Sequence, residues 1–83
     1  MVNEVVPLAD LMPTAIKWAN EILECAPLSV RASKQAALEG LGHPLDAALR
    51  LSYSESERMQ RSEDRVEGPR AFAEKRKPAW KGR

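Results

Sequence analysis

Cysteine and histidine each occur only once in this sequence, as Cys25 and His43. A single cysteine excludes a disulfide within the chain, and the two residues together are too few ligands for a zinc site. His43 lies in a Gly-His-Pro loop with no reason to meet a serine or Cys25, so no nucleophile–base pair is visible. We therefore predict no metal site and no catalytic residue in this chain. Cys25, at an apolar helix end, is expected to be a buried small hydrophobe.

Aromatic residues and long apolar runs are also scarce. The four aromatic side chains are Trp18, Tyr53, Phe72 and Trp80, so a core must be built from Ala, Leu, Val and Ile. No apolar run approaches the ~20 residues of a membrane span, and no signal peptide is visible, so we expect no membrane partner. The lone cysteine fits a reducing compartment such as the cytoplasm. A chain of 83 residues is marginally stable unless a partner covers part of its surface.

Charge is distributed unevenly along the chain. From Arg70 to Arg83 there are six basic residues and one acidic residue, a net charge of +5, whereas the other 69 residues carry seven basic and eleven acidic groups, a net charge of −4. Such a tail could meet phosphate, nucleic acid or an acidic surface, or it could be a solvated terminus. The carboxylate pairs Glu55/Glu57 and Glu63/Asp64 lie among arginines and indicate a solvated, ion-paired face rather than an acid–base pair.

The periodicity predicts a mainly α fold of three to four helices after a short N-terminal strand. Residues 2–7 predict a strand that stops at Pro7, and no second strand follows with which it could pair. Helices are expected from an Asp10 cap to about Cys25, over 27–40 with Pro27 at the first position, and over 45–60. A fourth helix, capped by Ser62, is expected to be interrupted at Gly68–Pro69 and to end near Lys75. Residues 79–83 are expected to be extended or disordered.

Phe72 and Lys75 are the most suggestive pair for binding. Three residues apart on a helix, they would share one face. An aromatic ring can stack on a base while a lysine meets a phosphate, so this face would suit a nucleotide. The other interpretation is that Phe72 packs in the core and Lys75 is simply exposed, and the residues alone leave both open.

The C-terminal residues from Ser62 to Arg83 resemble the C-terminal signature of the crotonase, or enoyl-CoA hydratase/isomerase, superfamily. The distinctive positions are Asp64, Glu67-Gly68, Ala71-Phe72 and Glu74-Lys75-Arg76, followed by Pro78, Trp80 and Gly82. The segments 2–7 and 26–34 also resemble that family, so the resemblance covers the whole chain. Pro69 departs from the pattern.

The resemblance implies that residues 1–7 end a ββα core that is missing here, that 8–77 form a C-terminal helical oligomerisation region, and that 78–83 are a basic tail. The family builds trimers, often paired into hexamers, and acts on acyl-CoA thioesters with a backbone oxyanion hole and glutamates of the core. None of those motifs is present here, so this chain alone is expected to be inactive. Coenzyme A would be the carrier of the substrate rather than a cofactor. The phenylalanine and lysine of the signature, Phe72 and Lys75 here, often line the pocket for the adenosine phosphate end of CoA.

The resemblance also implies a place in acyl-CoA metabolism, in the cytoplasm or, for a eukaryotic parent, the mitochondrial matrix. The alternative is a free-standing helical interaction module whose basic tail binds RNA or DNA. Salt-dependent binding of nucleic acid would favour that alternative, but the orphan strand fits it poorly.

Overall fold

The computed structural model describes residues 2–83, which form a series of helices without a β-strand. A 3₁₀ turn, η1 (Leu8–Asp10), leads into five α-helices: α1 (Leu11–Leu23), α2 (Pro27–Gly40), α3 (Leu45–Ala48), α4 (Ser54–Gln60) and α5 (Asp64–Ala73). The mainly α class is confirmed, with more and shorter helices than expected. Residues 2–7 form no strand, because a strand needs a neighbour for its backbone groups and the described residues supply none. Met1, the first residue of the expected 1–7 segment, lies outside the described residues.

The first two helices follow their local sequence signals closely. α2 begins with Pro27 at its first position and ends at Gly40, as predicted. α1 begins directly after Asp10, but the predicted Asp10 side-chain cap is wrong. Instead the Asp10 backbone N–H donates to the Pro7 carbonyl at 2.9 Å and closes η1.

The helix predicted over 45–60 is divided into α3 and α4. Tyr53 between them has extended backbone, with φ −101° and ψ 130°, and its hydroxyl donates to the Ala48 carbonyl at 3.0 Å. Gln35 of α2 accepts the Glu55 backbone N–H at 2.8 Å, which satisfies a donor in the first turn of α4. A contact from a neighbouring helix therefore stabilises a new helix start where the sequence pattern alone is continuous.

The predicted interruption at Gly68–Pro69 does not occur, because α5 runs through both residues. The residue before a proline normally avoids the helical region, since its Cβ clashes with the proline ring. Gly68 has no Cβ, which lowers that penalty. The Ser62 cap is confirmed in part: α5 begins only at Asp64, but the Ser62 hydroxyl accepts the Arg65 backbone N–H at 3.2 Å.

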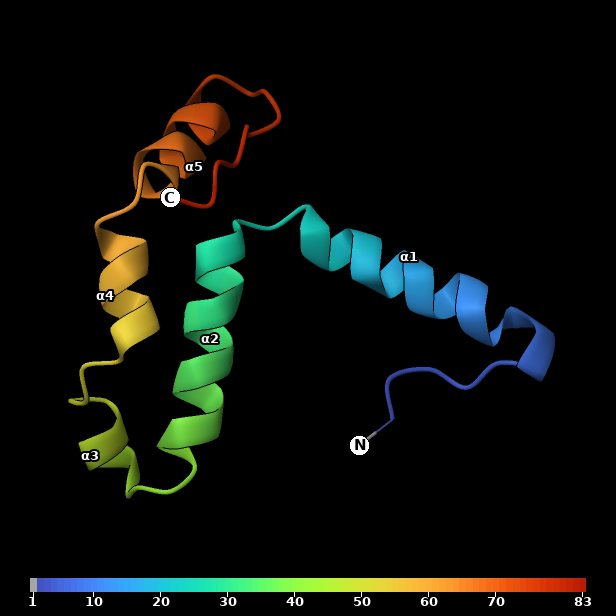
Figure 1. The fold of residues 1–83 in the computed structure, drawn as a ribbon, viewed down its shortest axis with the longest axis horizontal. Helices are drawn as coiled ribbons and strands as arrows, with labels where there is room; N and C mark the ends of the chain where they lie inside the picture. The colour runs from blue at the N-terminus through green and yellow to red at the C-terminus, as the bar shows by residue number, and fades with distance from the viewer. Residues whose placement is uncertain (1) are drawn as a thin grey trace.

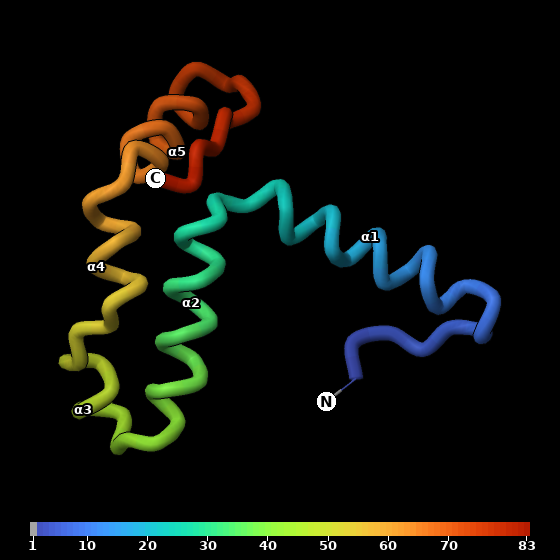
Figure 2. The backbone as a smooth tube through the Cα atoms, in the orientation of Figure 1, coloured from blue at the N-terminus to red at the C-terminus, as the bar shows by residue number. Residues whose placement is uncertain are grey.

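The helices form an open arrangement rather than a closed bundle. α2 and α4 lie side by side, joined at one end through α3, while α1 extends away from them (Figure 1). Residues 78–83 return beside α5 to the start of α2 (Figure 2). There a Cβ on Gly82 would lie 3.6 Å from the Pro27 side chain, and the Gly82 φ of +69° favours glycine. The few buried apolar residues are Leu28 and Ala32 on α2 and Ala71 on α5.

Within residues 2–83, no helix has both the length and the hydrophobicity that crossing a bilayer requires.

Candidate functional site

The candidate site lies at the C-terminal end of α5 and in the turn that follows it. Phe72, in the last turn of α5, is 87% exposed, and Lys75 is exposed as well. Packing of Phe72 in a core of this chain is therefore excluded. An exposed phenylalanine ring next to a basic turn keeps the nucleotide-contact interpretation open.

Lys75 does not lie on the same helical face as Phe72, so that expectation is wrong. α5 ends at Ala73, and Lys75 has left-handed backbone with φ 54°. The Lys75 N–H donates to the Phe72 carbonyl at 3.2 Å, and the Arg76 N–H donates to the Ala71 carbonyl at 3.0 Å. These two bonds close the helix end and turn the chain, so Lys75 leaves the helix in the turn that follows Phe72.

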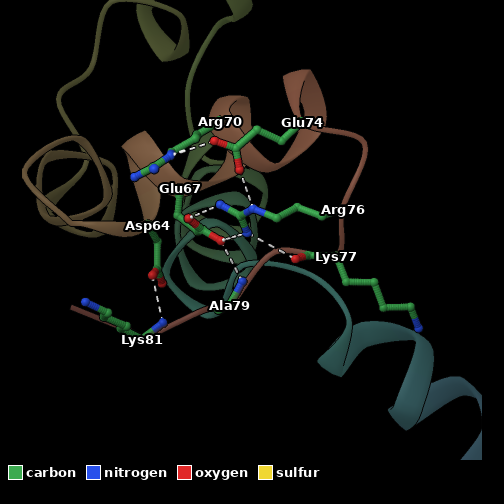
Figure 3. A network of polar contacts seen from close by, with 8 residues as sticks. All are labelled: Asp64, Glu67, Arg70, Glu74, Arg76, Lys77, Ala79 and Lys81. Atoms are coloured by element: carbon green, nitrogen blue, oxygen red, sulfur yellow. Dashed lines mark hydrogen bonds and ion pairs between the residues drawn. The ribbon is translucent and has the colours of Figure 1, made fainter.

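A network of ion pairs holds this turn against α5 (Figure 3). The Arg76 guanidinium donates to both carboxylate oxygens of Glu67, at 2.6 and 2.9 Å, and also to Glu74 at 2.5 Å. Glu67 additionally accepts the Ala79 backbone N–H at 2.8 Å. Glu74 pairs with Arg70 at 2.9 Å as well. Glu67 of α5 therefore holds the chain on both sides of residue 77, and Glu74, just past the helix end, adds a second contact to Arg76.

These contacts change the acidity of the groups involved. The hydrogen bonds from the Arg76 guanidinium, and next the Ala79 N–H, lower the pKa of Glu67 to about 2. The same guanidinium, followed by that of Arg70, lowers the pKa of Glu74. Pairing with Glu67 and Glu74 raises the pKa of Arg76. All three groups are thus charged at neutral pH.

Most of the basic tail is neutralised inside the chain. Arg70 and Arg76 are held by Glu67 and Glu74, as described above. Lys81 and Arg83 both pair with Glu63, at 2.7 and 3.3 Å. Among residues 2–83, the tail cations without an ion pair are Lys75 and Lys77. An extended cationic surface for nucleic acid is therefore not supported, and two lysines remain at the turn.

Asp64 was named as a position of the family signature, but its residue type and neighbours predicted only a solvated carboxylate. It is only 5% exposed, and its carboxylate accepts the N–H groups of Lys81 and Gly82, both at 2.8 Å. The Trp80 indole N–H donates to the Glu24 carbonyl at 2.9 Å, and the ring lies against Gly68. The spacing of Asp64 and Glu67 puts both on one helix face, but the local sequence does not show that the C-terminal segment returns to that face.

The two residues that could have suggested chemistry elsewhere lie apart from this site. Cys25 is exposed, so the expectation of a buried cysteine is wrong: α1 ends at Leu23, before the helix could carry Cys25 into a core. His43 lies in the turn between α2 and α3, as predicted. Residues 2–83 contain no group of three or more His, Cys, Asp and Glu that could hold a metal ion.

Comparison with known proteins decides the family. The family model described as enoyl-CoA hydratase/isomerase matches residues 1–83. The chain belongs to the enoyl-CoA hydratase/isomerase family. The resemblance read from Asp64, Glu67-Gly68 and Ala71-Phe72 is thereby confirmed.

Individual members of the enoyl-CoA hydratase/isomerase family are similar over the whole chain. Carnitinyl-CoA dehydratase of Escherichia coli (strain K12) is 40% identical over 87 residues, which cover 100% of this chain and 33% of that protein. (E)-Benzylidenesuccinyl-CoA hydratase of Thauera aromatica is 40% identical over 82 residues, with 99% of this chain and 32% of that protein covered. The chain spans about a third of the length of the curated relatives it matches.

Solved structures of this family share the helical arrangement. A protein of Novosphingobium aromaticivorans assigned as a short chain enoyl-CoA hydratase superposes with a TM-score of 0.92 at 48% identity, covering 99% of this chain and 32% of that one. An enoyl-CoA hydratase/isomerase from Mycobacterium paratuberculosis gives a TM-score of 0.89 at 44% identity, covering 96% of this chain and 32% of that one. The open arrangement of α1 to α5 is therefore that of the corresponding third of these family members.

Proposed function

We propose that this chain is the C-terminal helical region of an enzyme that hydrates or dehydrates an acyl-CoA thioester, and that it supplies one edge of the CoA pocket. The family assignment over residues 1–83 supports this proposal. The two relatives named above carry the names of a dehydratase and a hydratase, with different acyl groups on the same CoA carrier. The feature shared by those two names is CoA, so the part of the substrate that this region contacts is proposed to be CoA rather than the acyl group.

The observation that carries the proposal is the pairing of an exposed ring with unneutralised cations at the end of α5. Phe72 is 87% exposed, whereas phenylalanine side chains are usually buried in the core of a protein. Four of the six tail cations are held by carboxylates, but Lys75 has none within salt-bridge distance among residues 2–83. A ring that can stack on adenine and an ammonium that can meet a phosphate are the groups that the nucleotide end of CoA requires.

The test is Lys75→Ala in the full-length protein that contains this chain. We expect the dissociation constant for free coenzyme A to rise about three- to tenfold at low salt, since a charge-assisted contact to phosphate is lost. The effect should shrink at high salt, where screening already weakens the contact. Titration calorimetry at two salt concentrations measures it.

The matched control is Lys34→Ala, which removes the same charge from an exposed position on α2. It should leave the affinity unchanged. Equal affinity of the Lys75→Ala variant and the unmodified protein for coenzyme A would argue against the proposed pocket.

We also propose that the apolar surface of the chain is covered by the remainder of the enzyme and by further copies of it. Large apolar side chains along α1 and α3 are exposed, among them Leu11, Ile22, Leu45 and Leu49. An open groove of about 930 Å³ beside α2, α3 and α4 is lined by Leu45 and Leu49 together with Leu41 and Leu51. Contiguous exposed apolar surface favours association. A homo-oligomer and a cytoplasmic location stay predictions.

A further inference from the structure

The turn that carries Lys75 has an unusual residue for its geometry. The Arg76-to-Ala71 and Lys75-to-Phe72 backbone bonds form a Schellman motif, in which the residue just past the helix end adopts left-handed backbone. That position is usually glycine, because other residues suffer a clash at Cβ. Here it is Lys75, with φ 54°, and it is the only non-glycine residue with positive φ among those described.

A strained backbone persists only where the surrounding structure holds it, and here the neighbouring residue does so. Arg76 donates to both oxygens of Glu67, to Glu74, and to the Lys77 carbonyl at 3.2 Å. Ala79 is attached to the same Glu67 carboxylate. Glu74 before Lys75, and Arg76 and Ala79 after it, are thus all held by side-chain contacts. Figure 3 shows these contacts converging from α5 and from the segment that follows it.

The contacts of Arg76 with Glu67 and Glu74 form a clamp that neutralises the charge of Arg76 but not the charges of the lysines on either side of it. Lys75 and Lys77 have no carboxylate within salt-bridge distance among residues 2–83. A lysine in a position where glycine would be less strained, with its ammonium left unpaired, suits ligand contact better than it suits folding.

We propose that Glu67 and Arg76 are positioning residues, which hold Lys75 in the left-handed turn and so present its ammonium to the phosphates of a CoA thioester. This inference rests on the proposed CoA pocket. Glu67 and Arg76 themselves do not contact the ligand. Because the hydrogen bonds from Arg76 lower the pKa of Glu67 to about 2, the clamp stays ionised throughout the pH range in which an enzyme of this family would work.

Substitution of Lys75 by glycine should change stability and coenzyme A affinity in opposite directions. In the full-length protein, Lys75→Gly should raise the melting temperature, since glycine removes the strain, and should weaken the binding of free coenzyme A about as much as Lys75→Ala does. A residue that only completed the fold would not show opposite changes in stability and affinity.

The test of the clamp is a double-mutant cycle, with coenzyme A affinity measured by titration calorimetry in the full-length protein. Arg76→Ala and Glu67→Gln should each weaken binding about three- to fivefold. In a Lys75→Ala background they should have no further effect, because the group that they position is gone. Arg76→Lys, which keeps the charge but cannot form the two-pronged contact with Glu67, should also weaken binding. Arg31→Ala, at an exposed position of α2, is the control for loss of an arginine and should bind normally.

The outcomes distinguish the inference from the function on which it rests. The positioning role is wrong, while the CoA pocket stands, if Lys75→Ala weakens binding and the clamp variants do not. The same conclusion follows if a clamp variant weakens binding by the same factor with and without Lys75→Ala. If Lys75→Ala has no effect, the pocket and the clamp's role in it both fail. Should Arg76→Ala not fold, Arg76→Lys and Lys75→Gly still decide the question, and their melting temperatures report folding independently.

Discussion

At the scale of single residues, Glu67 joins α5 to the C-terminal segment by accepting hydrogen bonds from Arg76 and from the Ala79 N–H (Figure 3). Its pKa falls from 4.5 to about 2 on folding because the Arg76 guanidinium and then the Ala79 N–H stabilise the ionised form. A lowered pKa in the folded state means that the unfolded state binds more protons, so the contribution is complete above pH 4.5 and is lost as the pH falls toward 2.

We therefore expect Glu67→Gln to destabilise the protein at neutral pH, and the difference in unfolding free energy from the unmodified protein to shrink between pH 4.5 and about 2. Denaturant titrations at several pH values measure this. Gln60→Ala replaces a neutral side chain, so its difference should stay level over the same range. A Glu67→Gln difference that does not change with pH would show that the ion pair contributes nothing.

Residue identities were easier to predict than residue roles. The sequence singled out Phe72 and Lys75 but left open whether Phe72 packs in a core, and both side chains are exposed. Their predicted common helical face was wrong, because left-handed turns are normally marked in a sequence by glycine and here the position is lysine. Asp64 was predicted to be a solvated carboxylate, and no structural role was predicted for Glu67, because their partners are backbone N–H groups and an arginine that lie 9 to 18 positions away. Partners at that distance follow from the path of the chain, which the local pattern does not specify.

At the scale of elements, the segment 78–83 is an extended strap held by hydrogen bonds, whereas the sequence predicted that residues 79–83 would be extended or disordered. The buried Asp64 carboxylate accepts the Lys81 and Gly82 N–H groups, and the Arg83 carbonyl accepts the Glu63 N–H at 2.7 Å. Asp64→Ala removes both carboxylate contacts, and we expect a loss of about 2–3 kcal/mol in stability. Hydrogen exchange in the full-length protein should show lost protection at the Lys81 and Gly82 amides.

The control is Asp46→Ala, which removes an exposed carboxylate from α3 and should leave those two amides protected. Retained protection in Asp64→Ala would mean that other contacts of the strap, such as the Trp80 bond to Glu24, hold it without Asp64.

The bounds of some helices are set by local sequence signals, and those of others by contacts between segments. The bounds of α2 could be predicted, because Pro27 and Gly40 are local start and stop signals. The division of 45–60 into α3 and α4 could not, because it depends on Gln35 and Tyr53 forming contacts between segments. Such tertiary contacts override helix propensity, which is weak at the serines flanking Tyr53.

At the scale of the whole molecule, the chain is much less compact than a domain of its length. Its radius of gyration is 16.1 Å, whereas a compact domain of this length has about 12 Å. Its accessible surface is 7015 Å², against about 4,900 Å² for a compact protein of this mass. The excess of about 2,000 Å² is comparable to a large protein–protein interface, which supports the proposal that other parts of the assembled enzyme cover these faces.

The apolar face of α1 offers a direct test of that proposal. Ile16 is 54% exposed in this chain, and substitution of a freely exposed residue usually changes stability by only about 0.5 kcal/mol. If the face is covered in the full-length protein, Ile16→Asp places a charge in an apolar contact, and we expect a loss of more than about 2 kcal/mol or a smaller assembly. Lys17→Asp introduces the same group on the polar side of α1 and should be tolerated. Melting temperature and light-scattering mass report the two effects. An Ile16→Asp protein that keeps the mass and melting temperature of the unmodified enzyme would place this face of α1 in solvent in the assembled molecule. The excess apolar surface would then have to be explained by the exposed apolar residues outside α1, such as Leu41, Leu45 and Val66.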